Sequence, residues 1–170
     1  NLVAHLATTE RLMLIDPDMT IEDGMLQKLV EASRGLEAGL MFRPALKHVG
    51  DGRLDHTSPN VHMILLEDFV KVGGYDEDYC GNKGWSDVQL LRVMQQALKT
   101  RTREDLWFTF HHGNKKLPDA QVNSLDRSTA HNKALHIRKI AKLKKVGWQR
   151  FVKEVLGKKL RFEWEIVKWL

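Results

Sequence analysis

Two carboxylates, Asp16 and Asp18, stand one residue apart directly after a short apolar run. The run, Leu12 to Ile15, is followed by Pro17, which lacks the N–H that a strand ladder requires. A run of this kind predicts a strand buried on both faces, as in a parallel sheet. Open α/β sheets bind their ligands beyond the carboxyl ends of such strands. Because the two negative charges repel, the spacing favours a divalent cation with oxygen ligands.

An Asp-x-Asp pair is also found in turns, in EF-hand loops and in haloacid dehalogenase-like phosphatases, and the residues that follow it distinguish these. A pair of turn aspartates, one of them capping the next helix, is ordinary turn chemistry and stays open. A calcium-binding EF-hand loop fails, because it needs Gly at its sixth position and Glu at its twelfth, where this chain has Ile21 and Gln27. Asp16, Asp18 and Thr20 after an apolar strand also resemble the first motif of haloacid dehalogenase-like phosphatases. That resemblance would make Asp16 a nucleophile and Asp18 an acid/base.

A second stretch, residues 72–94, places aromatic and acidic side chains after a pair of glycines. Gly73 and Gly74 permit a backbone course closed to other residues, and a close approach to a ligand. Trp85 offers a flat apolar surface for stacking on a sugar ring. Asp87, in the first turn of a predicted helix, is held where it can take a proton from a hydroxyl group. Taken one at a time, the acidic residues are explained as well by a solvated turn and a helix start.

The order of these motifs resembles the family 2-like glycosyltransferases of GT-A fold. That family carries an apolar strand, Asp-x-Asp, a helix, then Gly-Gly-Phe/Tyr-Asp-Glu and Trp-Glu-Asp. This chain has Asp-Pro-Asp at 16–18, Gly-Gly-Tyr-Asp-Glu at 73–77 and Gly-Trp-Ser-Asp at 84–87. The resemblance covers about residues 1–112, and it departs from the family at Ser86, where the family has an acid.

Several roles follow from this resemblance alone. Asp16 and Asp18 would hold Mn²⁺ or Mg²⁺ on the diphosphate of a nucleotide-sugar donor, and the metal would neutralise the departing diphosphate. The donor would be a UDP-sugar, as is common in this family. Asp87 would deprotonate the hydroxyl of a carbohydrate or other acceptor. One of His111 and His112, after the next strand, would complete the metal shell. The residues that would line the acceptor and donor-sugar site are Gly73, Gly74, Tyr75, Asp76, Trp85 and Ser86.

The expected fold class is α/β: a partial GT-A-like mixed sheet flanked by helices, with a helical C-terminal extension. Residues 1–117 would form the catalytic portion and residues 118–170 a basic helical extension. The family binds the nucleotide base with strands that precede Asp-x-Asp, and these are not in this sequence. The resemblance therefore implies a chain that is inactive alone or completes itself as a homo-oligomer.

Apolar periodicity and turn residues predict the individual elements. The predicted helices are 1–9, 21–34 (capped by Thr20), 67–72, 87–99 (capped by Ser86) and basic helices after Pro118 with breaks near Gly147 and Gly157. The predicted strands are 12–15, 38–42 (closed by Pro44), 61–66 and 106–110, with an exposed hairpin or loop over 47–60. Arg43, after the second strand, is interpreted as a surface arginine rather than a phosphate contact.

The net charge of +5 is unevenly placed, because basic residues crowd the chain from Lys133 to Lys168. One interpretation lays this basic, aromatic tail on an anionic membrane as an amphipathic face. The favoured interpretation packs its aromatic residues on the domain and leaves its lysines in solvent. Nucleic acid is not an expected partner, since the basic residues follow no recognised motif.

The single cysteine, Cys80, excludes an intrachain disulfide and fits a reducing compartment. No apolar run reaches the roughly 18 residues of a membrane span, and no signal peptide is visible. The expected location is the cytoplasm, with peripheral membrane contact as the alternative. A non-catalytic carbohydrate-binding or interaction module is the remaining alternative to an enzyme.

Overall fold

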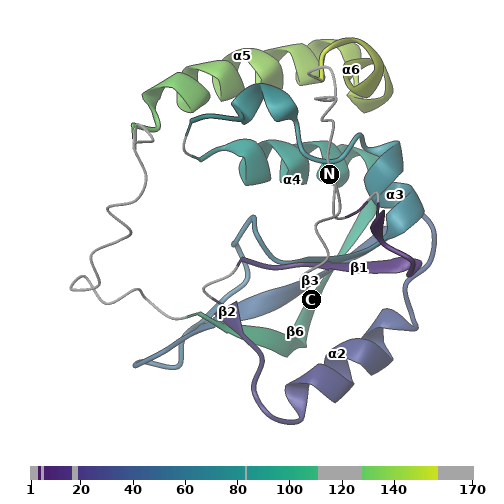
Figure 1. Cartoon of the computed structure of the whole chain (residues 1–170), viewed down its shortest axis with the longest axis vertical. Coiled ribbons are helices and arrows are strands. Elements are labelled where there is room, and N and C mark those ends of the chain that lie inside the picture. Colours follow the sequence, from purple (N-terminus) through teal and green to yellow (C-terminus); the bar gives the residue numbers. More distant parts are fainter. Residues whose placement is uncertain (1–3, 5, 17–18, 83, 111–127, 157–170) are drawn as a thin grey trace, which may run out of the picture.

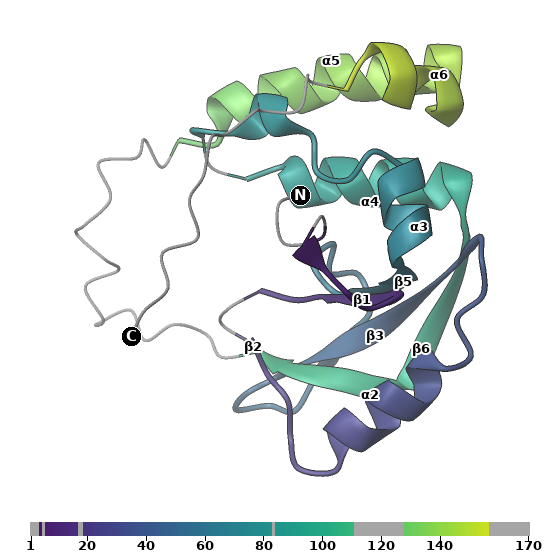
Figure 2. The same ribbon diagram turned by 45° about the vertical axis from the view of Figure 1, so that its right-hand side comes forward.

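The structure is a computed structural model of the chain, and it describes residues 4, 6–16, 19–82, 84–110 and 128–156. A curled sheet separates two groups of helices (Figure 1). Helix α2 (Met25–Ser33) lies on one face, and α3 (Leu66–Lys71) and α4 (Ser86–Ala97) lie on the other. Helices α5 (Ala130–Val146) and α6 (Trp148–Glu154) stack over α4, as the turned view also shows (Figure 2).

The sheet is mixed, with the strand order β1-β5-β3-β6-β2 and β4 paired to β3. Its strands are β1 (Arg11–Leu14), β2 (Met19–Thr20), β3 (Leu40–His48), β4 (Leu54–Asp55), β5 (His62–Leu65) and β6 (Lys99–Phe110). Strands β3 and β6 are parallel, and the other pairs are antiparallel. The expectation of a mixed sheet flanked by helices is therefore confirmed.

The prediction that the strand before Asp16 is buried in a parallel sheet is wrong. Strand β1 pairs antiparallel with β5, so that Leu14 lies opposite His62. Among the described strands β1 ends the sheet order, and its residues are exposed or half-buried. An apolar run does not distinguish such a strand from a central one, because the run reflects the two faces of the strand and not its neighbours.

Each face of the sheet has its own hydrophobic cluster. The cluster on the α4 side includes Met41, Ile64, Leu91 and Met94, and the cluster on the α2 side includes Leu29, Phe42, Met63 and Phe108. Successive residues of β1 divide in the same way, since Leu12 and Leu14 pack against the α4 side and Met13 against the α2 side. Asp16 follows two residues after the end of β1.

Three predicted boundaries need correction. Strand β3 continues through Pro44, because a register shift between Pro44 and Ala45 absorbs the missing N–H. Thr20 does not cap a helix, since it pairs with Thr109 in the sheet and the helix begins at Met25 after Gly24. Strand β6 starts at Lys99, well before residue 106, because its exposed polar half pairs with β3.

The other predicted elements in the described ranges are close to their expected places. Strand β5 and helices α3 and α4 differ from the predictions by a few residues at their ends. Strand β4 pairs with Leu46 and Lys47, which makes part of 47–60 a hairpin. Ala4 and Leu6 are helical.

The C-terminal helices pack into the body of the fold. Leu143 of α5 and Phe151 of α6 are buried in the cluster that also holds α4, and the chain turns between the two helices at Gly147, with φ of 75°. This supports the expected packing of the tail's aromatic residues over residues 130–156, but Lys139 of α5 is buried, which corrects the expectation that the tail's lysines lie in solvent. The expected boundary between 117 and 118, and the break at Gly157, lie outside the described residues. None of the described helices is long and apolar enough to cross a membrane.

Candidate functional site

Four polar residues from separate segments meet beyond the end of β1, and we call them the β1-end cluster: Asp16, Asn60, Tyr75 and Asp87. Asp16 follows β1, Tyr75 follows the Gly-Gly turn after α3, and Asp87 lies in the first turn of α4. Burial, together with the negative charges of Asp16 and Asp87, raises the pKa of Tyr75 from 10.0 to about 12. Both carboxylates therefore act on one phenol, although 71 residues of the chain separate Asp16 from Asp87.

Asn60 is a member of the cluster that sequence reasoning missed. Its Nδ2 donates a hydrogen bond to Oδ2 of Asp16, and its backbone N–H donates to Oγ of Ser58 over 3.3 Å. The same segment is fixed by His62, whose Nε2 lies 2.6 Å from the carbonyl oxygen of Pro59. The polar stretch 47–60 reads as an exposed loop, so no signal in the sequence points to Asn60.

Arg43 is half-buried, which corrects its interpretation as a surface arginine. Its Nη2 donates to the carbonyl oxygen of Ser58 over 2.9 Å, and its Nε is buried with no hydrogen-bond partner among the described residues. Burial lowers the pKa of Arg43, and the positive charge of Arg92 lowers it too, against the opposing charge of Asp55.

The Gly-Gly turn has the unusual backbone that the sequence predicts. Gly73 and Gly74 have φ of 86° and 66°, a region that side chains strongly disfavour. A Cβ atom on Gly73 would overlap the side chain of Leu156 and lie 3.1 Å from Val152. The close approach at Gly73 is therefore to the chain at the end of α6.

Asp76, expected among the substrate contacts, has its carboxylate in an internal ion pair. Nζ of Lys139 lies 2.5 Å from Oδ2 of Asp76 and 2.5 Å from Oδ2 of Asp78. The side chains of Lys139 and Asp76 are only 7% and 1% exposed, so this pair is buried. Asn132, four residues before His136 on α5, donates from Nδ2 to the carbonyl oxygens of Tyr79, Asn82 and Gly84. We call Asn132, Lys139 and these partners the α5 clamp.

Trp85 lies where the Gly-rich loop meets α4, and its backbone is strained. Its φ of 74° is the only positive value among the described residues other than glycine, and for a bulky side chain that conformation costs roughly 1–2 kcal/mol. One face of the indole lies on His136, with ring centroids 4.9 Å apart. Ser86 begins α4 but makes no capping hydrogen bond, since Trp85 occupies the cap position. Strain of this kind collects at functional sites.

The expected metal ligands can be placed only in part. Asp18, His111 and His112 lie outside the described residues, so Asp16 is the one member of that set with a described position. Within the described ranges, no group of three or more His, Cys, Asp or Glu side chains could hold a metal ion. The metal site therefore stays a prediction.

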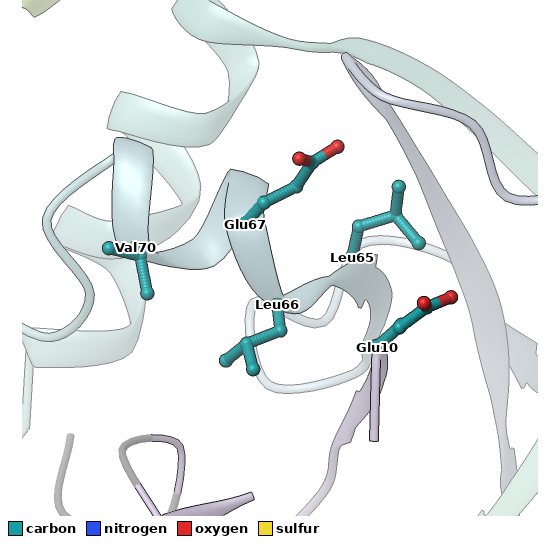
Figure 3. A pocket seen from close by; sticks show the side chains of 5 residues that line it. All are labelled: Glu10, Leu65, Leu66, Glu67 and Val70. Atoms are coloured by element: carbon teal, nitrogen blue, oxygen red, sulfur yellow. The ribbon is translucent and has the colours of Figure 1, made fainter. Parts of the chain in front are cut away.

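A pocket of about 610 Å³ lies at the junction of β5 and α3 (Figure 3). Glu10, Glu67 and three apolar side chains line it. Glu10 precedes β1, whereas Asp16 follows it, so this pocket lies at the opposite end of the strand from the β1-end cluster. It is not part of the candidate site.

Comparisons with known proteins add no family to this geometry. No protein-family model matches the chain, and the search of curated proteins finds no match. The α/β architecture and the positions of the described residues thus carry the functional argument by themselves.

Proposed function

We propose that this chain is the metal- and acceptor-binding portion of a metal-dependent glycosyltransferase. The observation that supports this best is the convergence of Asp16 and Asp87 on Tyr75, beyond the end of β1 and in the first turn of α4. Two carboxylates with different surroundings can take two roles, one toward a cation and one toward a proton. The acceptor would be a carbohydrate or another molecule with a free hydroxyl group.

Asp87 is the proposed base. Its place in the first turn of α4 fixes its backbone. Its negative charge acts on the half-buried ring of Tyr75 and on the buried ring of His136. Next to it, Trp85 has one ring face on His136, and the sugar would stack on the other. An acceptor hydroxyl on this wall would lose its proton to Asp87 as the new bond forms.

Asp16 is the one proposed metal ligand among the described residues, and its surroundings suit that role. Its carboxylate accepts a hydrogen bond from Asn60, and ligating carboxylates commonly have such an outer partner. With Asp18 and one of His111 and His112, it would offer the oxygen and imidazole donors that suit Mn²⁺, or Mg²⁺ if oxygens prevail. The bound ion would neutralise charge on the departing diphosphate.

The phosphatase alternative is less well supported. It needs a second acidic pair after another apolar strand, a place that Asp76 and Asp78 could fill by their position in the sequence. Both bind Lys139, and they follow a helix and the Gly-Gly turn rather than a strand.

Calorimetric titration of UDP, with and without Mn²⁺, tests the proposal. We expect binding that requires Mn²⁺ and is abolished in Asp16→Asn and in Asp18→Asn, with Asp51→Asn, an exposed loop carboxylate, as the matched control. Asn60→Ala should weaken the Mn²⁺-dependent binding about tenfold, as loss of an outer partner does.

UDP binding that ignores Mn²⁺, or that survives both substitutions, would contradict the metal site. A phosphatase would instead hydrolyse p-nitrophenyl phosphate and lose that activity in Asp16→Asn. A carbohydrate-binding module would bind sugars with no dependence on UDP or metal.

A further inference from the structure

A cavity of about 420 Å³ lies between α4 and α5. Its lining has three basic side chains, Arg92, His136 and Lys144, and two amides, Gln95 and Gln96. The remaining lining residues are apolar, and no Asp or Glu of the described chain is among them. Figure 2 shows α5 lying alongside α4, the two helices from which the lining residues come. The cavity is thus suited by composition to an anion.

The two cationic side chains of the lining, Arg92 and Lys144, form no ion pair within the described part of the chain, and the charge of Asp87 reaches only His136 among the lining residues. Nη1 of Arg92 donates to Oε1 of Gln95 over 3.2 Å, and the ion pairs formed by the described residues include neither Arg92 nor Lys144. The charge of Arg92 also reaches the half-buried Arg43 and the ring of His136. A bound anion would relieve this repulsion.

His136 adds an independent sign of a ligand. The residue is 8% exposed, and its Nδ1 is buried with no hydrogen-bond partner in the described part of the chain. Buried polar atoms are nearly always paired, so an orphan on a cavity wall points to a ligand or water there. The same ring lies on Trp85, 4.9 Å between centroids, and senses the charge of Asp87.

We infer that this cavity binds an acidic group, a carboxylate or a sulfate, of the acceptor, and that the acceptor is an anionic saccharide. The inference rests on the proposed function, which places the acceptor against Trp85 and Asp87. His136 joins that wall to the cavity, so an acidic substituent can enter the cavity while a hydroxyl of the same molecule faces Asp87. The donor diphosphate belongs elsewhere, at Asp16 beyond the end of β1.

Titration of the ¹⁵N- and ¹³C-labelled chain with glucuronate, followed by NMR, tests this. Glucose is the matched uncharged sugar, inorganic sulfate is the second anionic probe, and UDP without metal tests whether the donor is the source of the anion. We expect glucuronate and sulfate to shift the His136 ring and the Gln95 and Gln96 side-chain resonances with saturation, and glucose to leave them unchanged. Arg92→Gln should weaken the glucuronate affinity about tenfold, the effect of one charge-assisted hydrogen bond.

Lys145→Gln is the matched control, because Lys145 is exposed on α5 and does not line the cavity. Equal shifts by glucose, an affinity unaltered in Arg92→Gln, or displacement of glucuronate by metal-free UDP would each overturn the inference. Its failure is distinct from failure of the proposed function. Mn²⁺-dependent UDP binding with no glucuronate site would leave the transferase and remove the anionic acceptor, whereas a glucuronate site in a chain that binds UDP without regard to Mn²⁺, Asp16 and Asp18 would remove the metal site of the transferase.

Discussion

The α5 clamp and the β1-end cluster are both built from polar side chains that are distant in sequence, but their balance differs. In the clamp, the cation Lys139 forms ion pairs with two carboxylates, and Nδ2 of Asn132 donates hydrogen bonds to three carbonyl oxygens. In the cluster, Asp16 and Asp87 bring like charges to one phenol. Each region also has one buried amide oxygen with no hydrogen-bond partner among the described residues, Oδ1 of Asn60 in the cluster and Oδ1 of Asn132 in the clamp, so the difference lies in the charges.

Under the proposed function, this difference separates polar groups that stabilise the fold from polar groups that bind a ligand. A buried group with good partners contributes to one well-defined structure, whereas unbalanced charges lower stability and persist where function needs them. The clamp fixes the loop that carries Trp85, and so the balanced region positions the unbalanced one. Substitutions in the two regions should therefore affect stability and binding in opposite proportions.

The largest loss of stability is expected from Lys139→Ala. The substitution leaves the carboxylate of Asp76 buried without its cation, and breaking a buried pair in this way costs about 3–5 kcal/mol. Urea unfolding followed by circular dichroism measures the change in the free energy of unfolding. Lys142→Ala, an exposed lysine on the same helix, should change it by less than about 0.5 kcal/mol. Equal effects of the two substitutions would show that the clamp is not a stabilising pair.

A second large effect should come from acid, through His62. Burial lowers the pKa of His62 from 6.5 to about 4, so the unfolded chain binds a proton between these values while the folded chain does not. Stability is therefore highest above pH 6.5 and falls as the pH decreases toward 4, by roughly 3 kcal/mol at most. Urea unfolding at a series of pH values measures this.

The matched substitutions are His62→Gln and His131→Gln, since His131 is exposed at the start of α5. We expect His62→Gln to flatten the pH dependence between 6.5 and 4 and His131→Gln to leave it in place. Below pH 4.5 a further loss should begin, because hydrogen bonds from Thr109, Lys47 and Trp107 lower the pKa of Glu22 to about 2. A pH dependence unchanged in His62→Gln would assign it to other groups.

Local patterns predicted the segments whose signals lie within a few residues. Helix α4 has an apolar stripe and an acidic first turn, and β5 is a short apolar run, so both were found nearly in place. Asp16 and Asp87 each stand at the end of an element that local patterns indicate, and their assignment to one site stays a prediction from the family resemblance.

The contacts that complete the site are long-range, and the sequence gives no local sign of them. Asn60 reaches Asp16 across 44 residues, and Lys139 reaches Asp76 across 63. Lysine and asparagine on α5 look like ordinary solvent-facing residues of a basic helix, so the clamp was missed and Asp76 was assigned to substrate. Strand β3 was cut short at Pro44 for a related reason, because the register shift that accommodates the proline depends on β6.

The alkaline titration of Tyr75 sharpens the comparison within the cluster. With Tyr79→Phe as the background, Tyr75 is the single tyrosine of the chain, and its ultraviolet absorbance in the presence of EDTA reports its pKa. Asp16→Asn or Asp87→Asn should lower this pKa from about 12, part of the way toward the ordinary value of 10.0, because burial remains the largest cause. Asp51→Asn should leave it unaltered. No change in either cluster variant would mean that the carboxylates do not face the phenol.

The smallest effect on stability is expected from Asp87→Asn, and it is the counterpart of Lys139→Ala. Loss of a negative charge in the first turn of α4 removes a favourable helix-dipole interaction of about 0.3–1 kcal/mol. The substitution keeps the size of the side chain, so the free energy of unfolding should fall by less than about 1 kcal/mol. Urea unfolding measures this change in stability. The rate of sugar transfer, in a form of the protein that is catalytically active, measures the effect on function. A loss as large as that of Lys139→Ala would place Asp87 with the residues that hold the fold, because a proposed base must be replaceable without unfolding the protein.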